Sequence, residues 1–146
     1  MHYDLRLIAD LCDELGLQSQ LVADDSVAVI LDPLTSLRFK NYKNEIDSTD
    51  DCLIGFDGTP THSHGDLSFY ARGKSLEMSY LDVVSALVDG TVLICERWQS
   101  QELVDRWLVH KDFIDEFNYL EAGEEVRVRR TLLRGRRESS PGESHP

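Results

Sequence analysis

The stretch Gly55-Phe56-Asp57-Gly58-Thr59-Pro60-Thr61-His62-Ser63-His64-Gly65-Asp66 divides this chain of 146 residues into the two halves from which we predict its fold. The dipeptides Asp57-Gly58 and Thr59-Pro60 are typical of turns, because glycine allows a positive φ and proline fixes its own φ. We therefore expect a turn-rich loop here, preceded by one helix and early strands and followed by further strands and helices.

The first half predicts one helix and three strands. Apolar residues recur every three or four positions over 4–17, which predicts an amphipathic helix with Gly16 as its C-terminal stop signal. Short apolar runs predict strands at 27–31 and 52–56. Between them, 36–44 mixes basic and aromatic residues. In so acidic a chain we interpret it as an edge strand kept soluble by lysine, rather than as a nucleic-acid-binding strand.

The second half predicts a hairpin, two helices and three more strands. Trp98 and Trp107 fall near opposite ends of a predicted strand pair, and we expect both to pack in the core. In chain order, the expected elements are strands at 67–71 and 75–78, a helix at 79–88, an antiparallel pair at 91–98 and 103–110, a helix at 112–120 and a strand at 126–133.

These elements predict the fold class. Strands outnumber helices, and short turns join neighbouring strands, whereas a doubly wound sheet would need strict alternation of strands and helices. We therefore predict a single α+β domain over 1–134, with a mostly antiparallel sheet and about three helices. Residues 135–146 lack apolar side chains, which predicts a disordered polar tail.

The chain is strongly acidic, with 27 Asp and Glu against 15 Lys and Arg, a formal net charge of −12. Affinity for nucleic acid or for anionic membranes depends on cationic contacts, so this charge argues against both as partners. A basic protein partner would instead be attracted, and its association would be accelerated.

Other features of the composition indicate a soluble cytoplasmic protein. No apolar run approaches the roughly 20 residues of a membrane helix, and the first residues do not resemble a signal peptide. Cys12, Cys52 and Cys95 lie far apart, and their odd number cannot pair fully within one chain. We expect three buried, reduced thiols.

His62, His64 and Asp66 are the side chains best suited to chemistry. Alternate residues of an extended segment share one face, so the three would point the same way. Two imidazoles and a carboxylate can bind zinc or iron, and Asp57 could add a fourth ligand or a base. The alternatives are a structural turn whose histidines bond backbone or face solvent, and a loop that binds a partner.

The run from Thr61 to Asp66 resembles the His-x-His-x-Asp part of the signature of metallo-β-lactamase-type hydrolases. That signature continues with a histidine, where this chain has Leu67. The resemblance implies a small metal-dependent hydrolase, in which the metal lowers the pKa of a bound water.

In size, acidity and α+β organisation, residues 1–133 resemble the immunity proteins of bacterial polymorphic toxin systems. This resemblance implies a non-enzymatic cytoplasmic inhibitor that occludes a basic toxin without any cofactor. The expected binding residues are Asp50, Asp51, Asp57, His62, His64 and Asp66. A structural subunit of a larger assembly, with the tryptophan-bearing strand pair at its interface, is the third interpretation.

Overall fold

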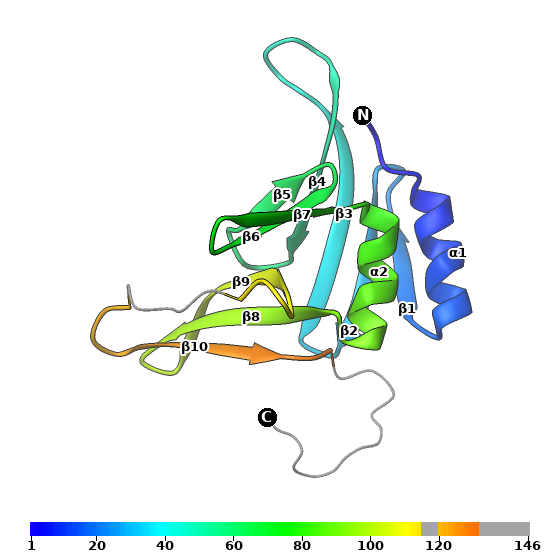
Figure 1. Cartoon of the computed structure of the whole chain (residues 1–146). Coiled ribbons are helices and arrows are strands. Elements are labelled where there is room, and N and C mark those ends of the chain that lie inside the picture. Colours follow the sequence, from blue (N-terminus) through cyan, green and yellow to red (C-terminus); the bar gives the residue numbers. More distant parts are fainter. Residues whose placement is uncertain (115–119, 132–146) are drawn as a thin grey trace.

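The computed structural model describes residues 1–114 and 120–131 (Figure 1). In this part of the chain, all paired strands are antiparallel. In chain order the elements are α1 (Leu5–Leu15), β1 (Gln18–Val22), β2 (Ser26–Asp32), β3 (Thr35–Lys43), β4 (Asp50–Phe56), β5 (His62–His64), β6 (Leu67–Ala71), β7 (Lys74–Met78), α2 (Tyr80–Asp89), β8 (Val92–Gln99), β9 (Glu102–His110) and β10 (Glu124–Arg129).

The strands form three sheets. The largest has the order β1-β2-β3-β4-β5, so each strand lies beside its neighbour in sequence. The second has the order β10-β8-β9, and the third is the hairpin β6-β7. Short connections between sequential strands explain this antiparallel arrangement.

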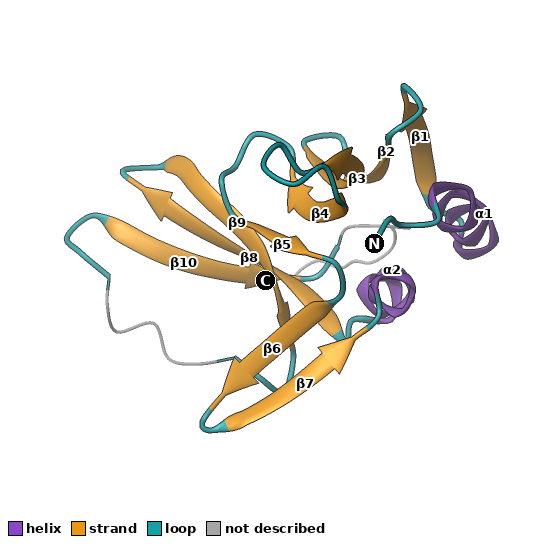
Figure 2. Cartoon of the chain, turned by 90° about the horizontal axis from the view of Figure 1, so that it is seen from above, coloured by secondary structure: helices purple, strands orange, loops and turns teal. Residues whose placement is uncertain are grey.

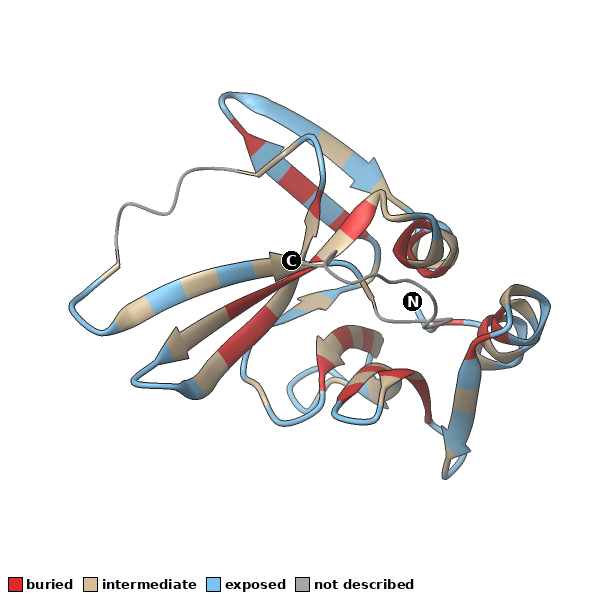
Figure 3. Ribbon diagram, turned by 90° about the horizontal axis from the view of Figure 1, so that it is seen from below, coloured by how far each residue is buried: buried red, intermediate tan, exposed pale blue. Residues whose placement is uncertain are grey.

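The core lies between the five-stranded sheet and the two helices, which cover the same face of that sheet (Figure 2). Along β2, β3 and β4 the side chains of this face are almost fully buried, which gives the alternating bands in Figure 3. The buried set includes Val27, Val29, Leu31, Leu37, Phe39, Cys52, Ile54 and Phe56 from the strands, and Ile8, Cys12, Val83, Val84 and Leu87 from the helices.

Local capping explains where the two helices begin and end. The carboxylate of Asp4 accepts a hydrogen bond from the amide of Leu7 at 3.0 Å, and Gly16 ends α1 with φ +75°. The hydroxyl of Ser79 accepts a hydrogen bond from the amide of Asp82 at 3.2 Å and so begins α2. Both helices were predicted at these positions.

The prediction of one sheet with about three helices was wrong. The described residues form two helices and three separate antiparallel sheets. Of the helix expected at 112–120, the described residues 112–114 are not helical, because the amides of Asp112 and Phe113 bond to His110 and turn the chain at the end of β9. Residues 115–119 of that segment, and the predicted tail at 135–146, lie outside the described residues. Neither described helix has the length and apolar character needed to cross a membrane.

The prediction that 36–44 forms an edge strand was also wrong. This segment is β3, which lies in the middle of its sheet and pairs with β2 on one side and β4 on the other. Arg38 and Lys40 are accommodated because they alternate with buried Leu37 and Phe39 and so point to the face opposite the helices. There Arg38 forms two hydrogen bonds to Asp57, at 2.8 and 2.9 Å.

The two tryptophans do not belong to the buried core, contrary to our expectation. Both are half-buried. The guanidinium of Arg127 lies 4.5 Å from the centre of the Trp98 ring, a cation–π distance. Trp107 lines a surface pocket. Strand pairing was predicted correctly here, but the strands extend beyond the core, which periodicity alone does not reveal.

A buried ionic cluster joins the three-stranded sheet to the β2–β3 turn. Glu96, which is 4% exposed, accepts hydrogen bonds from Arg106 at 2.9 Å and Arg129 at 3.1 Å. Arg129 also donates to the hydroxyl of Thr35 at 2.9 Å and lies 3.2 Å from a carboxylate oxygen of Asp32. Burial raises the pKa of Glu96, but the two guanidinium groups outweigh burial and lower it overall.

Candidate functional site

Five of the six residues predicted to bind a partner lie on or beside β4 and β5. Asp50 and Asp51 begin β4, and Asp57 directly follows its last residue. His62 and His64 are the two ends of β5, which pairs antiparallel with β4. These residues therefore lie along the outer strands of the five-stranded sheet, with Asp50 and Asp51 at one end of β4 and Asp57 at the other.

His64 is the centre of a polar cluster on this region. Its Nδ1 atom lies 3.2 Å from the hydroxyl of Tyr42, 3.1 Å from the carbonyl oxygen of Cys52 and 3.5 Å from a carboxylate oxygen of Asp51. The hydroxyl of Tyr42 donates a hydrogen bond to Asp51 at 3.0 Å. The amide of Cys52 and this hydroxyl lower the pKa of Asp51. The cluster is a set of mutually satisfied polar groups.

Asp66 does not join the two histidines. Gly65 has φ +69°, which interrupts the extended alternation on which the predicted triad depended. The side chain of Asp66 accepts a hydrogen bond from the amide of Tyr80, the first residue of α2, at 3.0 Å. Asp66 therefore holds the start of a helix in place.

The geometry bears on the predicted metal site. Within residues 1–114 and 120–131, no group of three His, Cys, Asp or Glu side chains is placed so that it could hold a metal ion. The rings of His62 and His64 lie 5.1 Å apart, and the carboxylate beside His64 is Asp51 rather than Asp66. Binding of zinc or iron by His62 and His64 stays a prediction.

Asp57 is also engaged in a structural contact. Both of its carboxylate oxygens accept hydrogen bonds from Arg38, in the bidentate geometry that makes such pairs strong. The hydrogen bond to Asp57 raises the pKa of Arg38. The suggested role of Asp57 as a fourth metal ligand or base is therefore not supported by its position.

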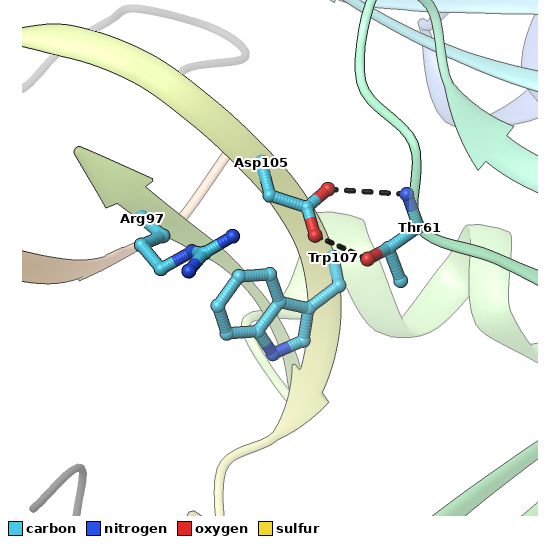
Figure 4. A pocket seen from close by; sticks show the side chains of 4 residues that line it. All are labelled: Thr61, Arg97, Asp105 and Trp107. Atoms are coloured by element: carbon cyan, nitrogen blue, oxygen red, sulfur yellow. Dashed lines mark hydrogen bonds between the residues drawn. The ribbon is translucent and has the colours of Figure 1, made fainter. Parts of the chain in front are cut away.

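Sequence reasoning missed a pocket of about 310 Å³ lined by Thr61, Arg97, Asp105 and Trp107 (Figure 4). Asp105 accepts hydrogen bonds from both the amide and the hydroxyl of Thr61. These bonds fasten the β4–β5 connection to β9. The pocket residues come from segments 44 positions apart, so no local motif could reveal them.

Sequence reasoning also missed Ile46, which belongs to the β3–β4 loop. This loop extends from the body in Figure 1. Ile46 is 96% exposed, more than any other large hydrophobic residue in the described part of the chain. The only sequence signal is an isolated isoleucine within a polar run.

The β3–β4 loop is ordered by its own hydrogen bonds. The amide of Ile46 donates to the side chain of Asn44 at 2.9 Å, and the amide of Ser48 donates to the carbonyl of Asn44 at 2.9 Å. Asp47 accepts from both the amide and the hydroxyl of Thr49, at 3.1 and 2.7 Å. The exposed isoleucine is therefore presented on a defined backbone.

Carboxylates of two turns lie at the same end of the sheet as Ile46. The β1–β2 turn and the end of β3 are joined, because the amide of Asn41 donates to the carbonyl of Asp25 at 2.7 Å. Hydrogen bonding to Thr49 lowers the pKa of Asp47, and Lys43 lowers that of Asp50, so both stay ionised at neutral pH. We call the exposed residues Asp24, Asp25, Glu45, Asp47 and Asp50 the acidic end.

Comparison of the chain with protein-family models, with curated proteins and with solved structures found no match.

Proposed function

We propose that this protein is a non-enzymatic binding module whose acidic end engages a basic partner protein, with Ile46 as the central apolar contact. The observation that carries this proposal is the exposure of Ile46, 96%, on a loop fixed by its own hydrogen bonds. An isoleucine exposed to water at this level contributes nothing to the stability of the monomer.

Burial of Ile46 by a partner would supply a substantial part of the binding free energy. Moving an isoleucine side chain out of water is worth about 2 kcal/mol, or roughly 30-fold in affinity. The loop is already ordered by the bonds to Asn44 and Asp47, so little conformational entropy is lost on binding.

The charges around Ile46 indicate the chemistry of the partner. Carboxylates at the rim of an interface attract a basic surface and accelerate association more than they strengthen the final complex. The partner that fits is therefore a basic protein with an apolar depression rimmed by lysine or arginine. An inhibitor that covers the site of a basic toxin, as the resemblance to immunity proteins implies, is one form of this function.

The buried cysteines bear on where this binding takes place. Cys12, Cys52 and Cys95 are all buried and free. Three unpaired thiols suit a reducing compartment, so we place the interaction in the cytoplasm.

The proposal is tested by capture experiments with a matched pair of variants. Ile46→Asp removes the apolar contact and adds a like charge, and Leu34→Asp makes the same change on the β2–β3 turn at an exposed fraction of 88%. Each immobilised protein is incubated with lysate of the source cell, and bound proteins are identified by mass spectrometry.

The expected result is a basic protein held by the wild type and by Leu34→Asp but not by Ile46→Asp. For the purified partner, Ile46→Ala should weaken binding roughly tenfold. Retention of the same partner by Ile46→Asp, or capture of acidic proteins only, would overturn the proposal.

A further inference from the structure

The five-stranded sheet ends in a strand whose outer side is open. β1 (Gln18–Val22) pairs with β2 along its whole length, and no described strand pairs with its other side. Every second residue of such a strand directs its amide and carbonyl groups away from the sheet. These groups form a template on which another strand can pair.

β1 lacks charge and proline, two of the devices that usually protect an open edge. Its sequence Gln18-Ser19-Gln20-Leu21-Val22 contains no charged residue and no proline. By comparison, β5 is only three residues long, and β10 has four charged residues among six. β6 (Leu67–Ala71) is also uncharged, and it provides a control edge for the experiment below.

An apolar margin accompanies this edge. Leu21 of β1 is 48% exposed, and Leu7 of the adjacent helix α1 is 44% exposed. Figure 1 shows α1 and β1 side by side at one end of the molecule, and Figure 3 shows β1 largely exposed. The edge therefore offers backbone hydrogen bonds and apolar surface together.

We propose that β1 pairs with β1 of a second copy of this chain, so that two five-stranded sheets join into one. An antiparallel strand is complementary to itself about a twofold axis, and the contact closes as a dimer. With the axis at Gln20, Gln18 lies opposite Val22 of the second copy and Ser19 lies opposite Leu21. β1 itself brings no charged side chain into this contact.

The net charge sets how this association depends on salt. Each copy carries −12, so long-range repulsion opposes the dimer at low ionic strength. Added salt screens this repulsion and should strengthen the dimer. Binding of a basic partner at the acidic end should instead weaken with added salt. The opposite salt dependence lets an experiment reject the dimer without rejecting the basic partner, and the reverse.

The first test is sedimentation velocity on the full chain over a range of protein and NaCl concentrations. We expect the mass to rise from 16.6 kDa toward twice that value with concentration, and to rise further with salt. Leu21→Lys should abolish the rise, although it reduces the net negative charge. Tyr70→Lys, at a 68% exposed residue of the control strand β6, should leave it unchanged.

Cross-linking tests the register. Gln20→Cys places two thiols opposite each other across the axis, whereas Gln18→Cys leaves them roughly 13 Å apart, too far for a disulfide. Rapid oxidation to a dimer by Gln20→Cys alone is expected. A monomer at every concentration and salt, a dimer that Tyr70→Lys breaks, or equal cross-linking by both variants would overturn the proposal.

Discussion

The side chain of Asp66 accepts a hydrogen bond from the backbone amide of Tyr80 at 3.0 Å, across 14 residues of sequence. The hydroxyl of Tyr80 in turn accepts a bond from the amide of Asp4, which caps α1. The hydroxyl of Tyr3 donates to the carbonyl of Gly65 at 2.7 Å. The stretch that looked most suited to chemistry thus ends in a joint between the two helices.

This joint predicts the effect of removing Asp66. Asp66→Ala leaves the amide of Tyr80 without its partner and should lower the free energy of unfolding by about 1 kcal/mol, as loss of a helix cap does. Asp10→Ala is the control, because Asp10 is an exposed α1 carboxylate for which the structure shows no hydrogen bond. Urea unfolding of the two variants measures the difference.

The same variant addresses the metal question. If Asp66 serves α2, any rise in melting temperature caused by added zinc should be identical in the wild type and Asp66→Ala, and should depend on His62 and His64. A zinc effect that disappears with Asp66→Ala would show that Asp66 is a metal ligand and that our assignment is wrong.

The buried ionic cluster predicts a large effect for Glu96. Glu96→Gln removes the negative charge that Arg106 and Arg129 share, and should cost about 3 kcal/mol at pH 7. The control is Glu125→Gln, whose ion pair with Arg127 is exposed, so this change should alter stability little. Equal losses in the two variants would contradict the role of the cluster.

The lowered pKa of Glu96 also predicts a pH dependence. Its contribution to stability is fully present above the unfolded pKa of about 4.3, and is lost as the pH falls through the lower folded pKa. The difference in unfolding free energy between the wild type and Glu96→Gln should therefore be constant from pH 5 to 7 and shrink below about pH 4. Urea titrations at each pH provide the test.

The acidic end predicts a kinetic effect once a basic partner is in hand. Asp47→Lys with Asp50→Lys should slow association severalfold and change dissociation little, because both carboxylates are exposed. Surface plasmon resonance at two salt concentrations separates the rates. An unchanged association rate would place the partner elsewhere on the molecule.

The cysteines predict that the folded protein is inert to thiol reagents. Burial raises the pKa of Cys12 to about 11 and that of Cys95 to about 12, and Cys52 is also buried. A colorimetric thiol reagent at pH 8 should therefore detect almost no thiol in the native chain and three after unfolding in guanidinium. Fast reaction of one thiol in the native state would indicate an accessible cysteine.

The sequence predicted most of the regular elements, because each is specified by contacts within a few residues. The helix at 4–17 follows from its apolar stripe and Gly16, and α2 follows from Ser79 with Asp82. The pair β8–β9 follows from apolar runs about the polar turn at 99–102. For these elements, periodicity and capping chemistry were sufficient.

The candidate site could be predicted only in part. Asp51, His62 and His64 lie close together because β4 and β5 are consecutive, paired strands. Asp50 instead pairs with Lys43 of β3. The exposure of Ile46 depends on how far the β3–β4 loop extends beyond the sheet, and the sequence of the loop alone does not predict this. The pocket beside Trp107 depends on a contact between β9 and a loop 44 residues earlier.

The sequence alone therefore determined where α1, α2 and most strands form, and that the surface is acidic. Only the tertiary structure decided the place of each strand in its sheet and the partner of each charge. β3 is central because β2 and β4 both pair with it, and Asp66 faces α2 because Gly65 reverses the alternation. Strand order and charge pairing depend on contacts between segments that are far apart in the sequence, and the local spacing of apolar residues contains no information about those contacts.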